Sequence, residues 1–393
     1  MEHLYVGVDI SKDRSSAHGI DESGKVYFSL FFDMESIGFG TLLRSIHQSC
    51  ADKSRVVVAM ESTACYHINL YSYLNAQGIQ AIIINPLLIA NFTRLSLRKT
   101  KTDKKDAETI ARFLSVHQES ITQIDLSQNH QEIRDLARER ESLSNQMSAV
   151  RVEIRRLLQS TFPELERLCN PFSKAMMHFI KRYPSAWSVR TARPTTVAKT
   201  LKQSRCSEKL TFTAEEIIER AKRSVASISP AKALILQGKL ETLEHLEQRK
   251  KGISKVLTEY CEASMLNDLE ILTSIDGINK GTATTFLAET GGVERFASHR
   301  SLIAYAGLDP TVYQSGKYEG MSRISKRGNR HLRRVIWIMT GCAVVHNPVF
   351  KAYFQKKKAE GQAPKKALFA TSHKLLRTIH AMLSHRTNFE VRC

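Results

Sequence analysis

The sequence lacks a hydrophobic run that could cross a membrane, and it lacks a cysteine pattern. Its longest apolar stretch, Val335 to Val345, is about half of the roughly 20 residues that a bilayer requires. The seven cysteines stand singly with no C-x-x-C pair, which predicts reduced thiols and neither a zinc site nor a disulfide framework. The start, Met1 to Tyr5, has no export signal pattern. We therefore expect a soluble, intracellular protein with no membrane partner.

Two further features are scarce, and each argues against a class of function. No P-loop motif is present, so the sequence gives no sign of ATP-driven chemistry. Aromatic residues make up only 7% of the chain, which argues against a base-stacking single-strand binder as the main activity.

Positive charge, in contrast, is abundant and concentrated at one end. The 393 residues include 58 Lys and Arg against 39 Asp and Glu, a formal net charge of +19. Residues 321–393 hold sixteen of these cations and two acidic residues, a net charge of +14. Because such an excess repels itself unless a polyanion neutralises it, nucleic acid is the predicted partner.

The first 120 residues show the alternating pattern of an α/β domain. Apolar, aromatic and β-branched runs predict three strands in a meander, followed by a parallel strand–helix–strand crossover. The strands are expected at residues 4–9, 15–20, 25–32, 54–60 and 80–85, with helices at 34–47 and 64–77. This order matches a ribonuclease-H-like layout.

The rest of the chain is predicted to be mostly helical. Long charged helical patterns cover residues 128–159 and 214–260, and Pro230 must break or begin a helix within the second. They predict two antiparallel arms or a dimerising coiled coil. We expect three domains, at residues 1–125, 126–265 with an inserted subdomain at about 162–212, and 266–393.

Four carboxylates are candidates for a shared metal site. Asp9 and Glu61 each end a predicted strand, where α/β folds place their ligand crevices. Asp103 and Asp106 lie three residues apart at the start of a predicted helix, so they share one helical face. Such a set suits one or two Mg²⁺ ions and phosphodiester chemistry. Singly, each residue is more readily a turn residue or a helix cap, whereas the four together favour the metal site.

A glycine-containing turn at residues 272–283 resembles a helix-hairpin-helix element, which offers backbone amides to a phosphate. Asn279 stands where that motif usually has a second glycine, and asparagine tolerates the left-handed conformation. An ordinary helical hairpin explains the pattern equally well.

Ser315 is a candidate nucleophile because Gly316 would let a phosphate approach and cations surround it. Ser-Gly is a turn in most proteins, so the pattern alone leaves its role open. Basic residues near the carboxylates and near Ser315 are the predicted nucleic-acid contacts. They are Arg98, Lys99, Lys101, Lys104, Lys105, Lys317, Arg323, Lys326, Arg327, Arg330, Arg333 and Arg334.

The motifs together carry a family resemblance. They are VGVD with Asp9, AMES with Glu61, Asn85-Pro86, KTDKKDA, IDGI, AYAGLDP, QSG with Ser315, and SRISKRGNRHLRR. The set resembles the DEDD insertion-sequence transposases, relatives of the Piv-type DNA invertases and known as bridge-RNA-guided serine recombinases. The likeness covers the first 120 residues and about residues 272–374.

The resemblance implies a RuvC-like N-terminal domain, a coiled-coil connection and a C-terminal transposase domain. It implies that Asp9, Glu61, Asp103 and Asp106 bind Mg²⁺, with Mn²⁺ as a substitute, and that Ser315 attacks DNA to form a phosphoserine link. The implied partners are double-stranded donor and target DNA and a structured noncoding guide RNA. The implied assembly is a tetramer, a dimer of dimers, at the nucleoid in a bacterial cytoplasm.

Two other functions remain open at this point. A RuvC-like Holliday-junction resolvase would use the same carboxylates and two metals to hydrolyse DNA, with Ser315 dispensable. A nucleic-acid-binding protein without catalysis would tolerate loss of Asp9.

Overall fold

The structure is a computed structural model, and the chain divides into two compact units, residues 1–129 and 130–393. It describes residues 3–61, 66–84, 88–89, 92, 103–117, 128–203, 211–311, 314–315, 318–319 and 323–391. Within these ranges, the side chains of residues 103–104, 128–129, 311, 314–315, 318–319 and 323 are not described.

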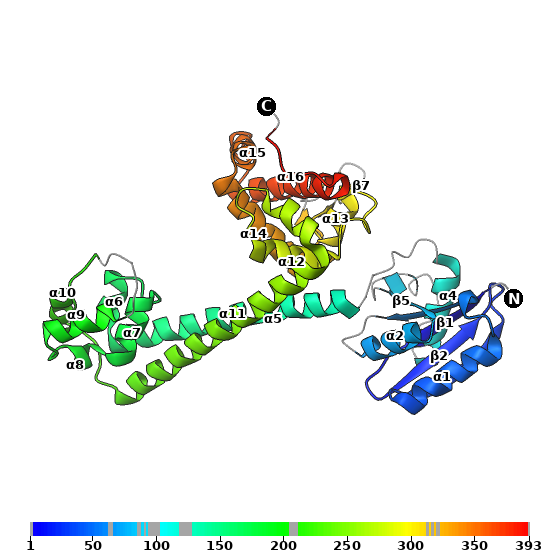
Figure 1. Ribbon diagram of the computed structural model, residues 1–393, viewed down its shortest axis with the longest axis horizontal. Helices are drawn as coiled ribbons and strands as arrows, with labels where there is room; N and C mark the ends of the chain where they lie inside the picture. The colour runs from blue at the N-terminus through cyan, green and yellow to red at the C-terminus, as the bar shows by residue number, and fades with distance from the viewer. Residues whose placement is uncertain are drawn as a thin grey trace. The chain divides into compact units, whose positions relative to one another are not determined.

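The first unit is built on one mixed sheet (Figure 1). Its strands are β1 (Leu4–Asp9), β2 (Arg14–Ile20), β3 (Val26–Asp33), β4 (Val56–Glu61) and β5 (Gln80–Ile84), in the order β3-β2-β1-β4-β5. The first three strands pair antiparallel, whereas β4 runs parallel to β1 and β5 parallel to β4. The predicted meander and parallel crossover are both confirmed.

Helices cover both faces of this sheet. They are α1 (Ser36–Ser49), α2 (His67–Ala76) and α4 (Asp103–His117), and a short 3-10 turn, η1 (Lys53–Arg55), precedes β4. Because strand side chains alternate between faces, Leu4, Val6 and Val8 pack in one apolar cluster with residues of α1 and α2. Tyr5 lies on the other face, in a cluster with Ile110 and other residues of α4.

His18, on β2, predicts how the stability of this unit changes with pH. The residue is buried, and burial lowers the pKa of its imidazole, outweighing the nearby Glu108 carboxylate. Below pH 6.5 the unfolded chain gains a proton at this histidine before the folded chain does, so the free energy of unfolding falls as the pH falls. We expect that fall, measured by urea unfolding between pH 7.5 and 5.5, to be smaller in His18→Gln.

The matched control is His47→Gln, because His47 is exposed on α1. It should keep the wild-type pH dependence. Equal slopes in wild type and both variants would show that His18 does not titrate differently in the folded and unfolded chains.

The second unit contains two long helices, α5 (Gln128–Thr161) and α11 (Pro230–Thr273), which lie side by side (Figure 1). Ion pairs between Glu139 and Arg249 and between Glu153 and Lys239 show that they run antiparallel. Pro230 begins α11, as the sequence predicts, and its N-cap is Ser229. The helical pattern that the sequence shows over residues 214–260 therefore corresponds to two helices, one that ends at Lys222 and α11.

A group of shorter helices joins α5 to α11. These are α6 (Pro163–Leu168), α7 (Lys174–Arg182), α8 (Ala186–Val189), α9 (Pro194–Lys202) and α10 (Ala214–Lys222). One apolar cluster takes in Phe179 of α7, Val197 of α9 and Ile217 of α10, together with α5 and α11 residues. The compact helical group thus continues past residue 212.

The C-terminal part packs helices around a core that includes Phe286, Leu302, Met339 and Leu375. Its elements are α12 (Lys280–Thr290), α13 (His299–Tyr305), β6 (Pro310–Thr311), β7 (Gln314–Ser315), β8 (Tyr318–Glu319), β9 (Arg323–Ile324), α14 (Arg330–His346), α15 (Pro348–Ala359) and α16 (Pro364–His385). Among the described residues, no single helix is long and apolar enough to cross a bilayer. Taken together, α14 and α15 have the length and composition of a membrane span, but the two helices are bent by 99° relative to each other.

Candidate active site

Two of the predicted carboxylates end neighbouring parallel strands. Asp9 is the last residue of β1 and Glu61 the last residue of β4. In the register of these strands Val8 lies opposite Met60, so Asp9 and Glu61 follow at the same edge of the sheet. Parallel neighbours are about 5 Å apart, which brings two acidic side chains together at the carboxyl ends of the strands.

Helix α4 packs directly on the face of β1 to which Asp9 points. A β-carbon placed on Gly7 would lie 2.2 Å from the Ala107 carbonyl oxygen and 2.3 Å from the Ala111 nitrogen, so the helix backbone rests directly on β1. Asp9, two residues after Gly7, points to this same face. Asp106 directly precedes Ala107 and is half-buried.

The donor chemistry of this edge fits a divalent cation, because carboxylate oxygens are the ligands that Mg²⁺ prefers. Asp103 begins α4, but its side chain lies outside the described residues. Asp9, Glu61 and Asp106 are described, and no group of three His, Cys, Asp or Glu among the described side chains is close enough to hold a metal ion.

Ser315 lies on a small hairpin. Gln314 and Ser315 of β7 pair antiparallel with Glu319 and Tyr318 of β8. A second ladder closes the chain around this hairpin, with Pro310 and Thr311 of β6 opposite Ile324 and Arg323 of β9. The pairing of β6 with β9 thus fixes the two points at which the segment that carries Ser315 leaves the C-terminal core and returns to it.

The predicted nucleic-acid contacts have different surroundings. Lys105, Lys326, Arg327, Arg330 and Arg334 are exposed, and Arg333 is half-buried. Arg333 donates from Nη1 to the Ala306 carbonyl oxygen at 2.9 Å, and Arg334 pairs with Glu141. Arg98, Lys99, Lys101 and Lys317, and the side chains of Lys104 and Arg323, fall outside the described residues.

The turn between α11 and α12 differs from the expectation in one respect. Gly277 takes the left-handed φ of +94°, and a β-carbon there would lie 2.6 Å from the Cys342 carbonyl oxygen of α14. Asn279, however, is extended, with φ −90° and ψ 163°. The left-handed conformation expected for Asn279 is therefore wrong, because this residue is the N-cap of α12 and accepts from the Thr282 amide.

A buried carboxylate that sequence reasoning missed links three segments of the second unit. The Glu289 side chain is completely buried and accepts two hydrogen bonds from Arg138 of α5, at 2.9 and 3.0 Å. It also accepts from Asn329 Nδ2 at 2.6 Å. Asn329 in turn caps α14 through the amides of His331 and Leu332. This network fixes the start of α14, the helix that follows the Ser315 hairpin in sequence.

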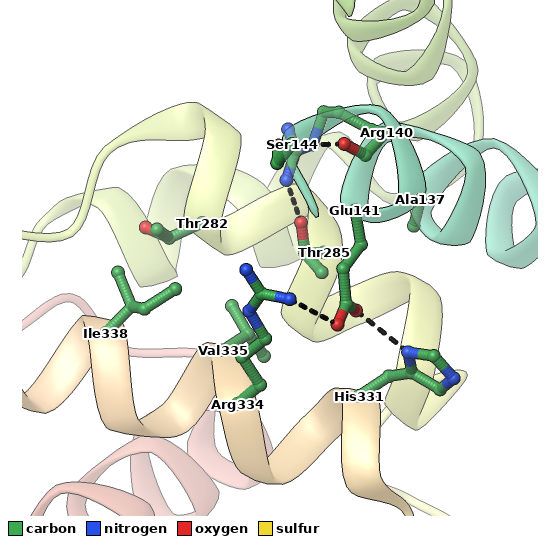
Figure 2. Close-up of a pocket in the computed structure, with 10 residues that line it drawn as sticks. All are labelled: Ala137, Arg140, Glu141, Ser144, Thr282, Thr285, His331, Arg334, Val335 and Ile338. Atoms are coloured by element: carbon green, nitrogen blue, oxygen red, sulfur yellow. Dashed lines mark hydrogen bonds and ion pairs between the residues drawn. The ribbon is translucent and has the colours of Figure 1, made fainter. Parts of the chain in front are cut away.

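A second set of polar contacts joins α5, α12 and α14 (Figure 2). The Glu141 carboxylate of α5 contacts His331 Nδ1 and Arg334 Nη1 of α14, each at 2.8 Å. Burial alone would raise the pKa of Glu141, but these hydrogen bonds outweigh it and lower the pKa. Arg140, the residue before Glu141, donates to the Thr285 hydroxyl and to the Gly281 carbonyl oxygen of α12.

Two family models match the chain. A model of the DEDD domain of IS110 transposases, described as "Transposase", matches residues 6–163. A second, "Transposase IS116/IS110/IS902 family", matches residues 269–355. The first range contains the strand-end carboxylates and the second contains the Ser315 hairpin. A DEDD domain implies dependence on a divalent metal, and the mixed sheet fits the RuvC-like fold.

Curated relatives align along most of the chain. The "Insertion element IS110 uncharacterized 43.6 kDa protein" of Streptomyces coelicolor is 22% identical over 99% of this chain and 96% of its own length. The "Transposase for insertion sequence element IS1111A" of Coxiella burnetii is 26% identical over 84% of this chain and 75% of its own. The "Pilin gene-inverting protein" of Moraxella bovis is 22% identical over 100% of this chain and 99% of its own. With a family domain towards each end, the protein belongs to the IS110 family of insertion-sequence transposases, which are DNA-cutting enzymes.

Proposed function

We propose that this transposase cuts and rejoins DNA by transesterification, through a covalent phosphoserine at Ser315. Asp9, Glu61, Asp103 and Asp106 are the proposed metal ligands. The observation that carries the proposal is the meeting of Asp9 and Glu61 at neighbouring parallel strand ends, with the start of α4 pressed onto β1 at Gly7. The shared strand edge of Asp9 and Glu61 supports the proposal, because metal-dependent attack on a phosphodiester needs carboxylates at such an edge.

Mg²⁺, or Mn²⁺ in its place, would supply positive charge that stabilises the attacking and leaving oxygens. The four carboxylates would hold that charge at the edge of the sheet. Exposed cations of the chain, among them Lys105, Lys326, Arg327 and Arg330, attract the DNA phosphates without reading sequence.

In the proposed step the Ser315 hydroxyl oxygen attacks phosphorus and loses its proton. The bond from phosphorus to the leaving deoxyribose oxygen breaks, and that oxygen takes up a proton. A deoxyribose hydroxyl of the joining strand later reverses the step and releases Ser315. Because each step exchanges one phosphoester for another, rejoining needs no ATP, in keeping with the missing P-loop.

The proposal includes a structured noncoding guide RNA that pairs with donor and target DNA, and a tetramer built as a dimer of dimers. The net charge of +14 over residues 321–393 supports binding of RNA in addition to DNA, because it provides more positive charge than a single contact with a duplex needs. The antiparallel α5 and α11 are the proposed coiled-coil connection, and the turn at Gly277 is the proposed helix-hairpin-helix element. Residues 266–393 are the proposed transposase domain.

The test is a covalent-adduct assay on a denaturing gel. Purified protein, Mg²⁺ and labelled element-junction DNA are combined with and without the RNA encoded beside the element. We expect a DNA-linked protein band in wild type that requires the RNA, that is lost in Ser315→Ala, and that is lost in Asp9→Asn. Ser148→Ala is the matched control, because Ser148 is exposed on α5 far from Ser315 in sequence, and it should keep the band.

Cleavage without any adduct, unchanged by Ser315→Ala but abolished by Asp9→Asn, would instead establish the hydrolytic resolvase. A full-strength adduct without RNA would remove the guide from the proposal and leave the serine chemistry in place.

A further inference from the structure

A pocket of about 300 Å³ opens between α14, α16 and the β6–β9 ladder. Its floor is apolar and partly aromatic, and its rim is basic. The described lining residues are Leu308, Ile324, Ile336, Trp337, Phe369 and Ser372, with Lys326, Arg330, Arg333 and Arg334 at the rim. The rings of Trp337 and Phe369 lie 4.9 Å apart at an angle of 49°, so the pocket presents an aromatic wall. None of these lining residues is acidic.

Of the four rim cations, two are held by neighbouring oxygens, and two form no ion pair within the described part of the chain. Arg333 is held by the Ala306 carbonyl and Arg334 by Glu141. Lys326 and Arg330, in contrast, form no ion pair with any carboxylate among the described residues. Their charge is therefore available to an anionic ligand at the mouth of the pocket.

The backbone at Lys326 is fixed in a costly conformation. Its φ of +54° is left-handed, which disfavours a residue with a side chain by about 1–3 kcal/mol. The Lys326 amide donates to the Gly307 carbonyl oxygen at 3.1 Å, and the preceding Ser325 amide donates to the Asp309 carbonyl oxygen at 2.8 Å. These backbone hydrogen bonds thus keep Lys326 at the rim of the pocket, although its backbone would otherwise favour a right-handed or extended conformation.

The pocket adjoins the segment that carries the proposed nucleophile. Ile324, in its wall, pairs with Pro310 in the ladder that closes the hairpin. Ser315 is four residues from Thr311 of this ladder, which limits the separation of their Cα atoms to about 14 Å. A strand attacked at Ser315 can therefore reach the pocket within a few nucleotides.

We propose that this pocket receives one nucleobase, unstacked from the DNA strand that Ser315 attacks. The base stacks on Trp337, and the flanking phosphates meet Lys326 and Arg330. An aromatic wall suits any base, because every base has a π-face, and a base inside a duplex cannot reach a concave site unless it leaves the stack. The proposal rests on the proposed function for the identity of the strand, but base binding by the pocket can be measured alone.

The chain offers a matched pair of fluorescent probes, since it has two tryptophans. Trp187→Phe leaves Trp337 as the only tryptophan, and Trp337→Phe leaves Trp187, whose ring is covered by Arg190 at 3.4 Å. Each full-length variant is titrated with an eight-nucleotide oligothymidylate and with an abasic oligonucleotide of the same length and charge. We expect saturable quenching by the oligothymidylate only in Trp187→Phe, and no quenching of either variant by the abasic oligonucleotide.

Two variants measure the contributions of the wall and the rim. Trp337→Ala should weaken binding of the oligothymidylate by about 5- to 150-fold and leave binding of the abasic oligonucleotide unchanged, since stacking contributes about 1–3 kcal/mol per base. Lys326→Gln should weaken both oligonucleotides equally, because it removes a phosphate contact. This second variant, at an exposed residue, keeps the test valid if Trp337→Ala fails to fold.

Equal quenching of Trp337 by the two oligonucleotides, or no quenching by either, would overturn the proposal. If oligouridylate bound more than tenfold more tightly than oligothymidylate, the ligand of the pocket would be RNA, and the proposal of a DNA site would be overturned. Saturable quenching of Trp337 by the oligothymidylate, together with a wild-type protein that cleaves DNA without any adduct, would keep the base pocket while removing the phosphoserine mechanism.

Discussion

Gly7→Ala is expected to abolish the covalent adduct and to lower the free energy of unfolding of the first unit by about 3 kcal/mol, at the upper end of the cost of overpacking. The added methyl would meet backbone atoms of Ala107 and Ala111, which cannot rotate away as a side chain can. Helix α4 must then move off β1, and Asp106 moves away from Asp9 and Glu61 with it. Hydrogen exchange on the full-length protein should show faster exchange in β1 and α4, and the adduct assay reports the lost chemistry.

Gly40→Ala is the matched control in the same unit. Gly40 lies within α1, and nothing lies within 4 Å of a β-carbon placed on it. Alanine there should raise stability by up to about 1 kcal/mol, through helix propensity, and leave the adduct unchanged. If Gly7→Ala retained both wild-type exchange and wild-type adduct, the close approach of α4 to β1 would have no part in the carboxylate site.

Glu289→Ala is expected to destabilise the second unit by about 3 kcal/mol, the cost of breaking a buried ion pair from one side. The substitution leaves Arg138 and Asn329 without the carboxylate that accepts their hydrogen bonds. Because Asn329 caps α14, the start of that helix and the segment before it should loosen as well. Urea unfolding measures the first effect, and a reduced rate of adduct formation at full DNA binding measures the second.

Glu262→Ala provides the comparison, because Glu262 forms a surface pair with Lys280 at 2.9 Å. Its loss should change stability by no more than about 1 kcal/mol. Equal effects of the two substitutions would mean that the buried network adds nothing beyond an ordinary surface pair.

Much of the first unit is predictable because its signals are local. The strand ends at Asp9 and Glu61 follow from β-branched and apolar runs, and the structure places both ends where the sequence predicts them. The approach of α4 to β1 is also encoded, since Gly7 interrupts an apolar strand where a close backbone contact occurs.

The remainder depended on information that periodicity does not hold. Pro163 and Pro194 lie in the predicted inserted subdomain, and each begins a helix at its first turn, where a missing amide hydrogen costs nothing. Glu289 was missed because its neighbours Phe286 and Leu287 favour a core helix, and an acid there gives no hint of partners far along the chain. The sequence holds one hint, the acid directly after Phe286, Leu287 and Ala288, because an acid at the end of an apolar run is seldom buried unless it is paired.

The regular part of α11 restricts how the length of this family can vary. The helix is uninterrupted from Pro230 until Met265, where the backbone leaves the helical conformation, with φ −141° and ψ 38°. Within this stretch Leu236 and Leu243 pack in the cluster of the short helices, whereas Leu257 packs with Ile133 of α5 and Ala288 of α12. One inserted residue between these contacts would rotate one apolar stripe by about 100° relative to the other. Insertions and deletions in related elements should therefore accumulate in the loop at residues 223–229 or near Met265, and spare the stretch between them.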